Sequence, residues 1–196
     1  MTFTGNGGRN FQPRKSMPLD GAAKCIEKAT AGEMRAGDFF PHSSAHPLCY
    51  SVAYYLKDGG RCRSLTDFFN VEELRSMLVR GYLLQPGEAG QGVFRQAIDR
   101  LWAGGDPGNF LPAVRSLVER VYPTGRTLSK VERQAAAEQN LLAVYLHSHM
   151  DEDTLDLARL AVCPDQVPDP EGRLIPACAY NLFYRQKDPR FWCASA

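Results

Sequence analysis

Apolar residues recur every three to four positions along most of the chain, the spacing typical of helices with one buried face. Residues that begin or end helices stand between these segments. Asn70 with Glu73, and Ser129 with Glu132, form capping boxes, whereas Gly32 and Gly81 stand where helices are expected to end. The pattern predicts helices over residues 21–30, 47–56, 70–80, 91–103, 110–122 and 129–139.

The pattern changes near residue 141. Apolar Leu142, Val144 and Leu146 alternate with Tyr145 and His147, which is the period of a strand with one buried face. Beyond it the sequence predicts a short helix opened by Asp153 and Asp156, a proline-rich loop over 163–172 and a second strand over 173–184. The first 20 residues, rich in Gly and polar side chains, predict an extended arm before one domain over 21–196. The expected fold class is therefore α+β, a mostly helical single domain with a small β-sheet.

Composition narrows the classes of function. The 196 residues are 44% hydrophobic and 23% charged, which is ordinary for a globular domain, and the formal net charge is only +1. Nucleic-acid binders usually carry a clear basic excess, so no nucleic-acid partner is expected. The apolar run over 141–146 is far shorter than the roughly 20 residues of a membrane span. The N-terminus lacks the apolar core of a signal peptide, so a cytoplasmic location is expected.

Six cysteines are the first sign of chemistry, and they are widely spaced. In a cytoplasmic chain they are expected to be reduced thiols or metal ligands rather than disulfides. No C-x-x-C pair is present, and neither is the C-x-x-x-C-x-x-C triplet that holds a radical-SAM cluster. Any metal site must therefore be assembled from distant parts of the fold.

Several segments, taken in order, resemble the C-terminal region of radical-SAM proteins related to tetraether lipid synthase. They are GGRN at 7–10, CIEKATAG at 25–32, GDFFPHSSAHPLCYSVAYYL at 37–56, HMDEDTLDLARLAVC at 149–163 and GRLIPACAYN at 172–181. The resemblance implies a region that carries auxiliary iron–sulfur clusters beside the radical-generating one. It also implies a radical-SAM catalytic chain or domain as partner, because this chain lacks the cysteine triplet and cannot cleave S-adenosylmethionine by that route alone.

The resemblance also implies a set of ligands. Cys49, Cys163 and Cys178 stand where the family has cysteines, but Ser44 and Pro164 stand where it often has two more. Three thiolates suit iron, and the fourth position could be open or filled by His46 or, less readily, by the Ser44 hydroxyl. The sequence places Cys49 in the first turn of a predicted helix, where the helix dipole favours a thiolate. Cysteines are, however, also common as small buried core residues.

A second candidate constellation is His147, His149 and Asp151. If the strand continues, all three project to one face, where imidazole and carboxylate could bind Zn²⁺ or Fe²⁺. Three functions follow from these residues. The first is an auxiliary iron–sulfur or metal-binding module of a radical-SAM enzyme acting on carbon. The second is a non-catalytic interaction domain with structural zinc or no metal. The third is a small zinc hydrolase using His147, His149 and Asp151. The substrate and the oligomeric state stay open.

Overall fold

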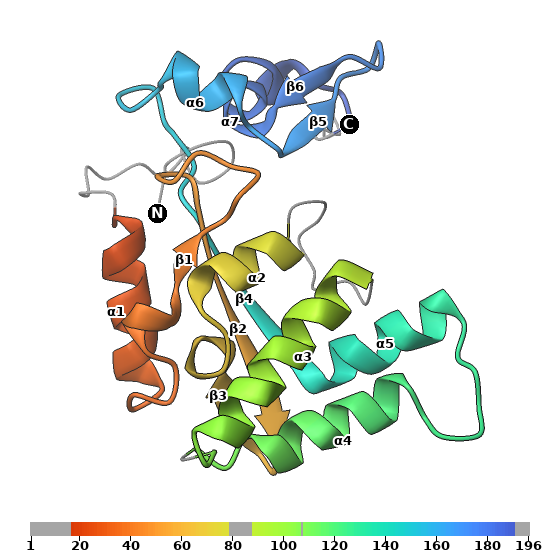
Figure 1. Ribbon diagram of the computed structural model, residues 1–196. Helices are drawn as coiled ribbons and strands as arrows, with labels where there is room; N and C mark the ends of the chain where they lie inside the picture. Colours follow the sequence, from red (N-terminus) through yellow and green to blue (C-terminus); the bar gives the residue numbers. More distant parts are fainter. Residues whose placement is uncertain (1–16, 79–87, 107, 191–196) are drawn as a thin grey trace.

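Strand β2 (Tyr50–Asp58) lies at the centre of the structure, a computed structural model that describes residues 17–78, 88–106 and 108–190 (Figure 1). All its pairings are antiparallel. Strand β4 (Leu141–His147) pairs with it from Tyr50 to Leu56. Strands β1 (Phe40–Pro41) and β3 (Arg61–Ser64) pair with its first and last parts, respectively. The turn from β2 into β3 consists of Gly59 and Gly60, both with positive φ (56° and 85°), as a tight two-residue hairpin requires.

Both faces of β2 are covered. The six consecutive residues from Ser51 to Leu56 are all buried, which half-exposed strands never show. Val52, Tyr54 and Leu56 belong to the main hydrophobic core, where they join residues of η3 and of the helices between β3 and β4. On the other face the Tyr55 hydroxyl donates to the buried Asp38. The alternation of a strand thus sends successive side chains into two different environments.

Helices surround this sheet (Figure 1). One lies on its own on one side of the sheet, and four others gather over the opposite side. In chain order they are α1 (Leu19–Ala29), α2 (Val71–Met77), α3 (Glu88–Ala103), α4 (Leu111–Val121) and α5 (Lys130–Asn140), with short 3₁₀ turns η2 (Ala36–Asp38) and η3 (Leu65–Asp67). Within the described ranges, no helix combines the length and apolar content needed to cross a bilayer.

The C-terminal segment folds beyond the end of the sheet where β4 finishes and β2 begins (Figure 1, blue). It starts with helix α6 (Leu157–Ala161) and a two-stranded hairpin of β5 (Gln166–Pro168) and β6 (Leu174–Pro176). Helix α7 (Ala177–Ala179), a π-helical turn η4 (Tyr180–Tyr184) and a 3₁₀ turn η5 (Arg185–Lys187) follow without interruption. The mostly helical α+β class expected from the sequence is confirmed.

The largest correction concerns residues 47–56, for which the sequence predicts a helix. Pro47 to Cys49 form a turn instead, and β2 follows. An unbroken apolar run does not distinguish a buried helix from a strand buried on both faces. The aromatic residues of this run favour the strand, and pairing with β4 decides the outcome. The stop predicted at Asp58 to Gly60 is confirmed, although it is a hairpin turn rather than a helix end.

The predicted strand over 173–184 is also wrong beyond its first residues. Only Leu174–Pro176 pairs, and the chain turns helical at Ala177. The helix before Cys163 exists, but its cap is Asp156 alone, whose side chain accepts the amides of Ala158 and Arg159. Of the predicted N-terminal arm, residues 1–16 lie outside the described residues, as does the predicted helix end at Gly81. Leu19 already belongs to α1.

A buried carboxylate joins the N-terminal part to the sheet. Asp38, 2% exposed, accepts hydrogen bonds from the backbone and guanidinium of Arg35, from Thr66 Oγ1 and from the Tyr55 hydroxyl. Burial on its own would raise the pKa of Asp38. The bonds from Arg35 and Thr66 outweigh burial and hold that pKa below its ordinary value. Asp38 therefore stays ionised and links η2, β2 and η3.

We expect Asp38→Asn to lower the free energy of unfolding by about 2–3 kcal/mol, because it leaves the guanidinium without its buried acceptor. The loss is measured by urea unfolding at neutral pH. In the wild type the stabilisation by Asp38 is present above its unfolded pKa of about 4 and is lost as the pH falls further. Asp20→Asn, which removes an exposed pair with Lys24, serves as control and is expected to cost less than about 0.5 kcal/mol. Equal effects of the two substitutions would contradict this role for Asp38.

Candidate functional site

Cys49 stands at the start of β2 and is held by the neighbouring strand. Its amide donates to the carbonyl of His46 (2.8 Å), which closes the turn after Pro47. Its carbonyl accepts the amide of Ser148 (2.8 Å), so the pairing of β2 with β4 extends past the ends of the two strands. The side chain is buried at 8% exposure. Its sulfur is therefore fixed by the sheet, not by a helix N-terminus as the sequence suggests.

A guanidinium approaches Cys49 from α6. Arg159 Nε donates to the Cys49 sulfur at 3.1 Å. Its Nη2 donates to two backbone carbonyls, those of Leu48 and Ser148, each at 3.2 Å. One side chain thus joins α6 to the ends of both central strands. The positive charge beside Cys49 comes from this arginine and replaces the helix dipole expected from the sequence.

The other two candidate cysteines come from the C-terminal segment. Cys163 follows Val162, the C-cap residue of α6, and its sulfur lies 3.2 Å from the carbonyl of Asp165. Cys178 lies in α7, buried at 4% exposure, and its sulfur accepts the amide of Met150 at 3.3 Å. Amide and guanidinium donors aimed at sulfur are the contacts that stabilise thiolates and tune metal–sulfur centres.

Burial and the neighbouring charges both act on the thiol of Cys178. Burial raises the pKa of the Cys178 thiol, and the charges of Cys163 and Cys49 raise it further. The Met150 amide and the Arg159 charge act in the opposite direction. Contacts through Arg159, Asp156 and Met150 link Cys49 to Cys178, and Cys163 follows the helix that carries Arg159. We call Cys49, Cys163 and Cys178 the cysteine site.

Two histidines adjoin the cysteine site. The rings of His147 and His149 lie with their centroids 3.9 Å apart, and Tyr50 stacks on His147 at 4.4 Å. His147 Nδ1 is 3.3 Å from a carboxylate oxygen of Asp165, and His149 Nδ1 is 3.7 Å from the Cys178 sulfur. Burial lowers the pKa of His147 to about 4 and also lowers that of His149. Both rings are therefore neutral at pH 7, the form in which imidazole binds metals.

The other candidate residues form hydrogen bonds with residues two or three positions away in the sequence. The Asp151 carboxylate accepts the amide and hydroxyl of Thr154, and β4 ends before it, at His147. His46 Nδ1 accepts the Leu48 amide (3.2 Å), and the Ser44 hydroxyl lies 2.8 Å from His42 Nδ1. The carboxylate beside the histidines is Asp165 rather than Asp151.

The donor set fits a single metal ion poorly. Within the described ranges, no group of three or more His, Cys, Asp or Glu side chains has an arrangement that could hold one ion. An iron–sulfur cluster makes a different demand, because its several iron atoms separate the sulfur ligands. Thiolates that receive N–H donors are the kind of ligand that such clusters use; Cys49 and Cys178 have such donors, and the three candidate thiols are one fewer than the usual four.

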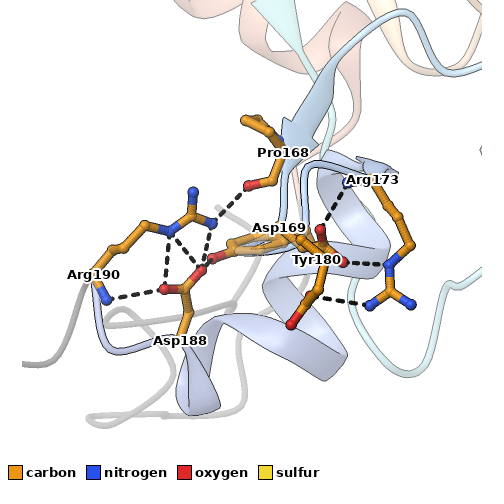
Figure 2. A network of polar contacts seen from close by, with 7 residues as sticks. Pro168, Asp169, Arg173, Tyr180, Asp188 and Arg190 are labelled. Atoms are coloured by element: carbon orange, nitrogen blue, oxygen red, sulfur yellow. Dashed lines mark hydrogen bonds and ion pairs between the residues drawn. The ribbon is translucent and has the colours of Figure 1, made fainter.

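A polar clasp fixes the segment that carries Cys178 (Figure 2). Asp188, 4% exposed, accepts the Tyr180 hydroxyl and the guanidinium of Arg190, whose Nη2 also reaches the carbonyl of Pro168 at 2.6 Å. The bonds from Arg190 and Tyr180 hold the pKa of Asp188 well below its ordinary value. This clasp ties η4, two residues after Cys178, to the β5–β6 hairpin.

The sequence patterns do not predict a role for Arg159 or Asp165. Arg159 lies within a segment quoted for the family resemblance, and a cation among cysteines is a known sign of reactive or ligating thiols. Nothing in the local spacing indicates that it reaches Cys49, which is 110 residues away. Asp165, two residues after Cys163, could have been noted only from its place in the proline-rich loop.

The chain is similar over 95% of its length to the 7,8-dihydro-6-hydroxymethylpterin dimethyltransferase of Methanocaldococcus jannaschii, with 22% identity over 210 aligned residues. It spans 42% of the length of that protein. No protein-family model matches the chain. The similarity is that of a distant relative.

The neutral histidines predict a pH dependence of the metal-free protein. The unfolded chain takes up a proton on His147 as the pH falls below its ordinary pKa of 6.5, while the folded state resists protonation until about pH 4. Stability therefore decreases from neutral pH towards pH about 5, above the range in which most carboxylates titrate. We expect His147→Gln to lessen this decrease, as measured by urea midpoints at the two pH values. Parallel pH profiles for wild type and variant would rule out a neutral, buried His147.

Proposed function

We propose that this chain is the auxiliary iron–sulfur part of a radical-SAM protein, with Cys49, Cys163 and Cys178 as cluster ligands. The observation that supports the proposal is that two of these three sulfurs each receive an N–H donor, Arg159 Nε at Cys49 and the Met150 amide at Cys178. Buried core cysteines do not need N–H donors directed at their sulfurs. Ligands of an anionic cluster are stabilised by them.

The distant relation to a dimethyltransferase supports the same class. We take that relative as a radical-SAM enzyme, and the ordered motifs of this chain resemble radical-SAM proteins as well. A radical-SAM catalytic chain or domain is proposed as its partner, which is consistent with this relation. The reaction is proposed to modify carbon, and the substrate class stays open.

The fourth ligand position is proposed to belong to His149 or to stay open. His149 Nδ1 lies 3.7 Å from the Cys178 sulfur, and its ring is neutral at pH 7. His46 is less suited, because its Nδ1 accepts the Leu48 amide. A position without a protein ligand would leave one iron accessible to a substrate atom.

The roles of the chain's own residues follow from their contacts. A bound cluster would supply electron transfer or a place to hold substrate. The sheet holds Cys49 in place through the Ser148 amide, and the Met150 amide directs its hydrogen bond at the Cys178 sulfur. Asp165 orients His147, which in turn packs on His149. The clasp around Asp188 keeps α7 and η4 against the hairpin.

The alternative is a non-catalytic interaction domain. It is favoured by one observation, that within the described part of the chain no group of side chains could hold a single ion. In that case Cys49 and Cys178 are buried core residues, Cys163 is a half-buried thiol, and the chain acts only through its surface. Metal content distinguishes the two functions directly.

We expect the full chain, reconstituted without oxygen with iron and sulfide, to become brown and to bind about four irons for a [4Fe–4S] cluster. Cys163→Ala is expected to abolish or strongly reduce the iron content, because it removes one of only three proposed thiolates. Iron and sulfide assays with visible absorbance provide the measurement. A wild-type protein that stays colourless and iron-free would refute the proposal.

Cys25→Ala is the matched control. Cys25 is exposed on α1, where its sulfur lies 4.0 Å from that of Met17, and its removal is expected to leave the iron content unchanged. Cys178 is buried, so Cys178→Ala is also compared with wild type by urea unfolding, which separates lost ligation from lost folding.

A further inference from the structure

Arg159 contacts residues beside both central strands and a sulfur of the cysteine site. Among the described contacts, its guanidinium is the only group that reaches Cys49 together with the residues next to the start of β2 and the end of β4. Its Nη2 donates to the carbonyls of Leu48 and Ser148, which fixes the plane of the guanidinium. With that plane fixed, Nε–H points at the Cys49 sulfur at 3.1 Å. The planar donor geometry of arginine permits all three bonds at once, which a lysine ammonium does not reproduce.

The helix behind Arg159 is itself anchored at the site. Asp156 caps α6 by accepting the amides of Ala158 and Arg159, and its own amide lies 3.3 Å from the sulfur of Met150. The Met150 amide in turn donates to Cys178. The position of Arg159 is therefore set by the loop that also holds another sulfur of the site.

The charge of Arg159 is not compensated by a carboxylate. In the described residues, no ion pair joins its guanidinium to Asp or Glu, whereas most other arginines near the C-terminal segment have such a partner, for example Arg173 and Arg190. A cation with backbone anchors and no counter-ion is suited to an anionic group bound among the cysteines.

We propose that Arg159 is the positioning residue of the cysteine site, which orients the Cys49 sulfur and raises the reduction potential of a cluster bound there. This inference rests on the proposed function. A cluster that accepts one electron becomes more negative, so a nearby fixed cation and an N–H donor to its sulfur stabilise the reduced form more than the oxidised form. Arg159 itself is not a ligand.

The test is a redox titration of the reconstituted full chain with dithionite and mediators, followed by visible absorbance. Arg159→Gln is expected to lower the midpoint potential, and a tenfold shift of the one-electron equilibrium corresponds to about 59 mV. Arg159→Lys keeps the charge but loses the fixed Nε–H, so an intermediate potential is expected. Arg115→Gln removes the same charge from an exposed pair on α4 and is expected to keep the wild-type potential. A wild-type potential in Arg159→Gln would overturn the proposal.

A second measurement needs no cluster. In the metal-free protein, the Nε–H resonance of Arg159, assigned by its loss in Arg159→Lys, is expected to shift in Cys49→Ala and to stay in place in Cys25→Ala. An unchanged resonance in Cys49→Ala would overturn the positioning role. If the wild type binds no iron, the proposed function and the effect on potential both fail, while this resonance still decides whether Arg159 holds Cys49.

Discussion

The pairing of β2 with β4 is the constraint on which the rest of the structure depends. It buries six consecutive residues of β2 and provides the surface on which the helices between β3 and β4 pack. It also brings residue 49 beside residue 148, since the Cys49 carbonyl accepts the Ser148 amide just beyond the last paired residues. The C-terminal segment then folds against this end of the sheet. Without the strand pair, the first cysteine of the site has no fixed position.

Fixed hydrogen-bond donors complete the site around that frame. Two sulfurs receive N–H groups, one from a guanidinium and one from a backbone amide, and two neutral imidazoles lie next to them. The C-terminal segment is also stabilised by its own polar contacts, such as the hydrogen bonds that Asp188 accepts from Tyr180 and Arg190. The chain thus separates two tasks. Ion pairs on buried carboxylates hold its parts together, while the cation at Arg159 has no carboxylate partner among the described residues and donates to Cys49.

Features with a local cause could be predicted from the sequence. The capping boxes at Asn70 and Ser129 begin α2 and α5 as expected, because both partners of each box lie within four residues. The identity of β2 could not be read in this way, since a run buried on both faces carries no period and its state is decided by β4. Likewise, the cysteines could be named as candidates, but the sequence gives no sign that Arg159 reaches Cys49. That contact depends on the tertiary fold.

The distance along the chain between Arg159 and Cys49, 110 residues, has a consequence for folding. A ligand set built from neighbouring residues can capture iron while the rest of the chain is still unfolded. Here the contact order of the site is high, and closing so long a loop carries an entropy cost before any sulfur is in place. We therefore expect the contact between Arg159 and Cys49 to form only after the strands have paired. With that order of events, the proposed cluster would bind only to the folded chain. A partly folded chain would expose separate thiols rather than a binding site.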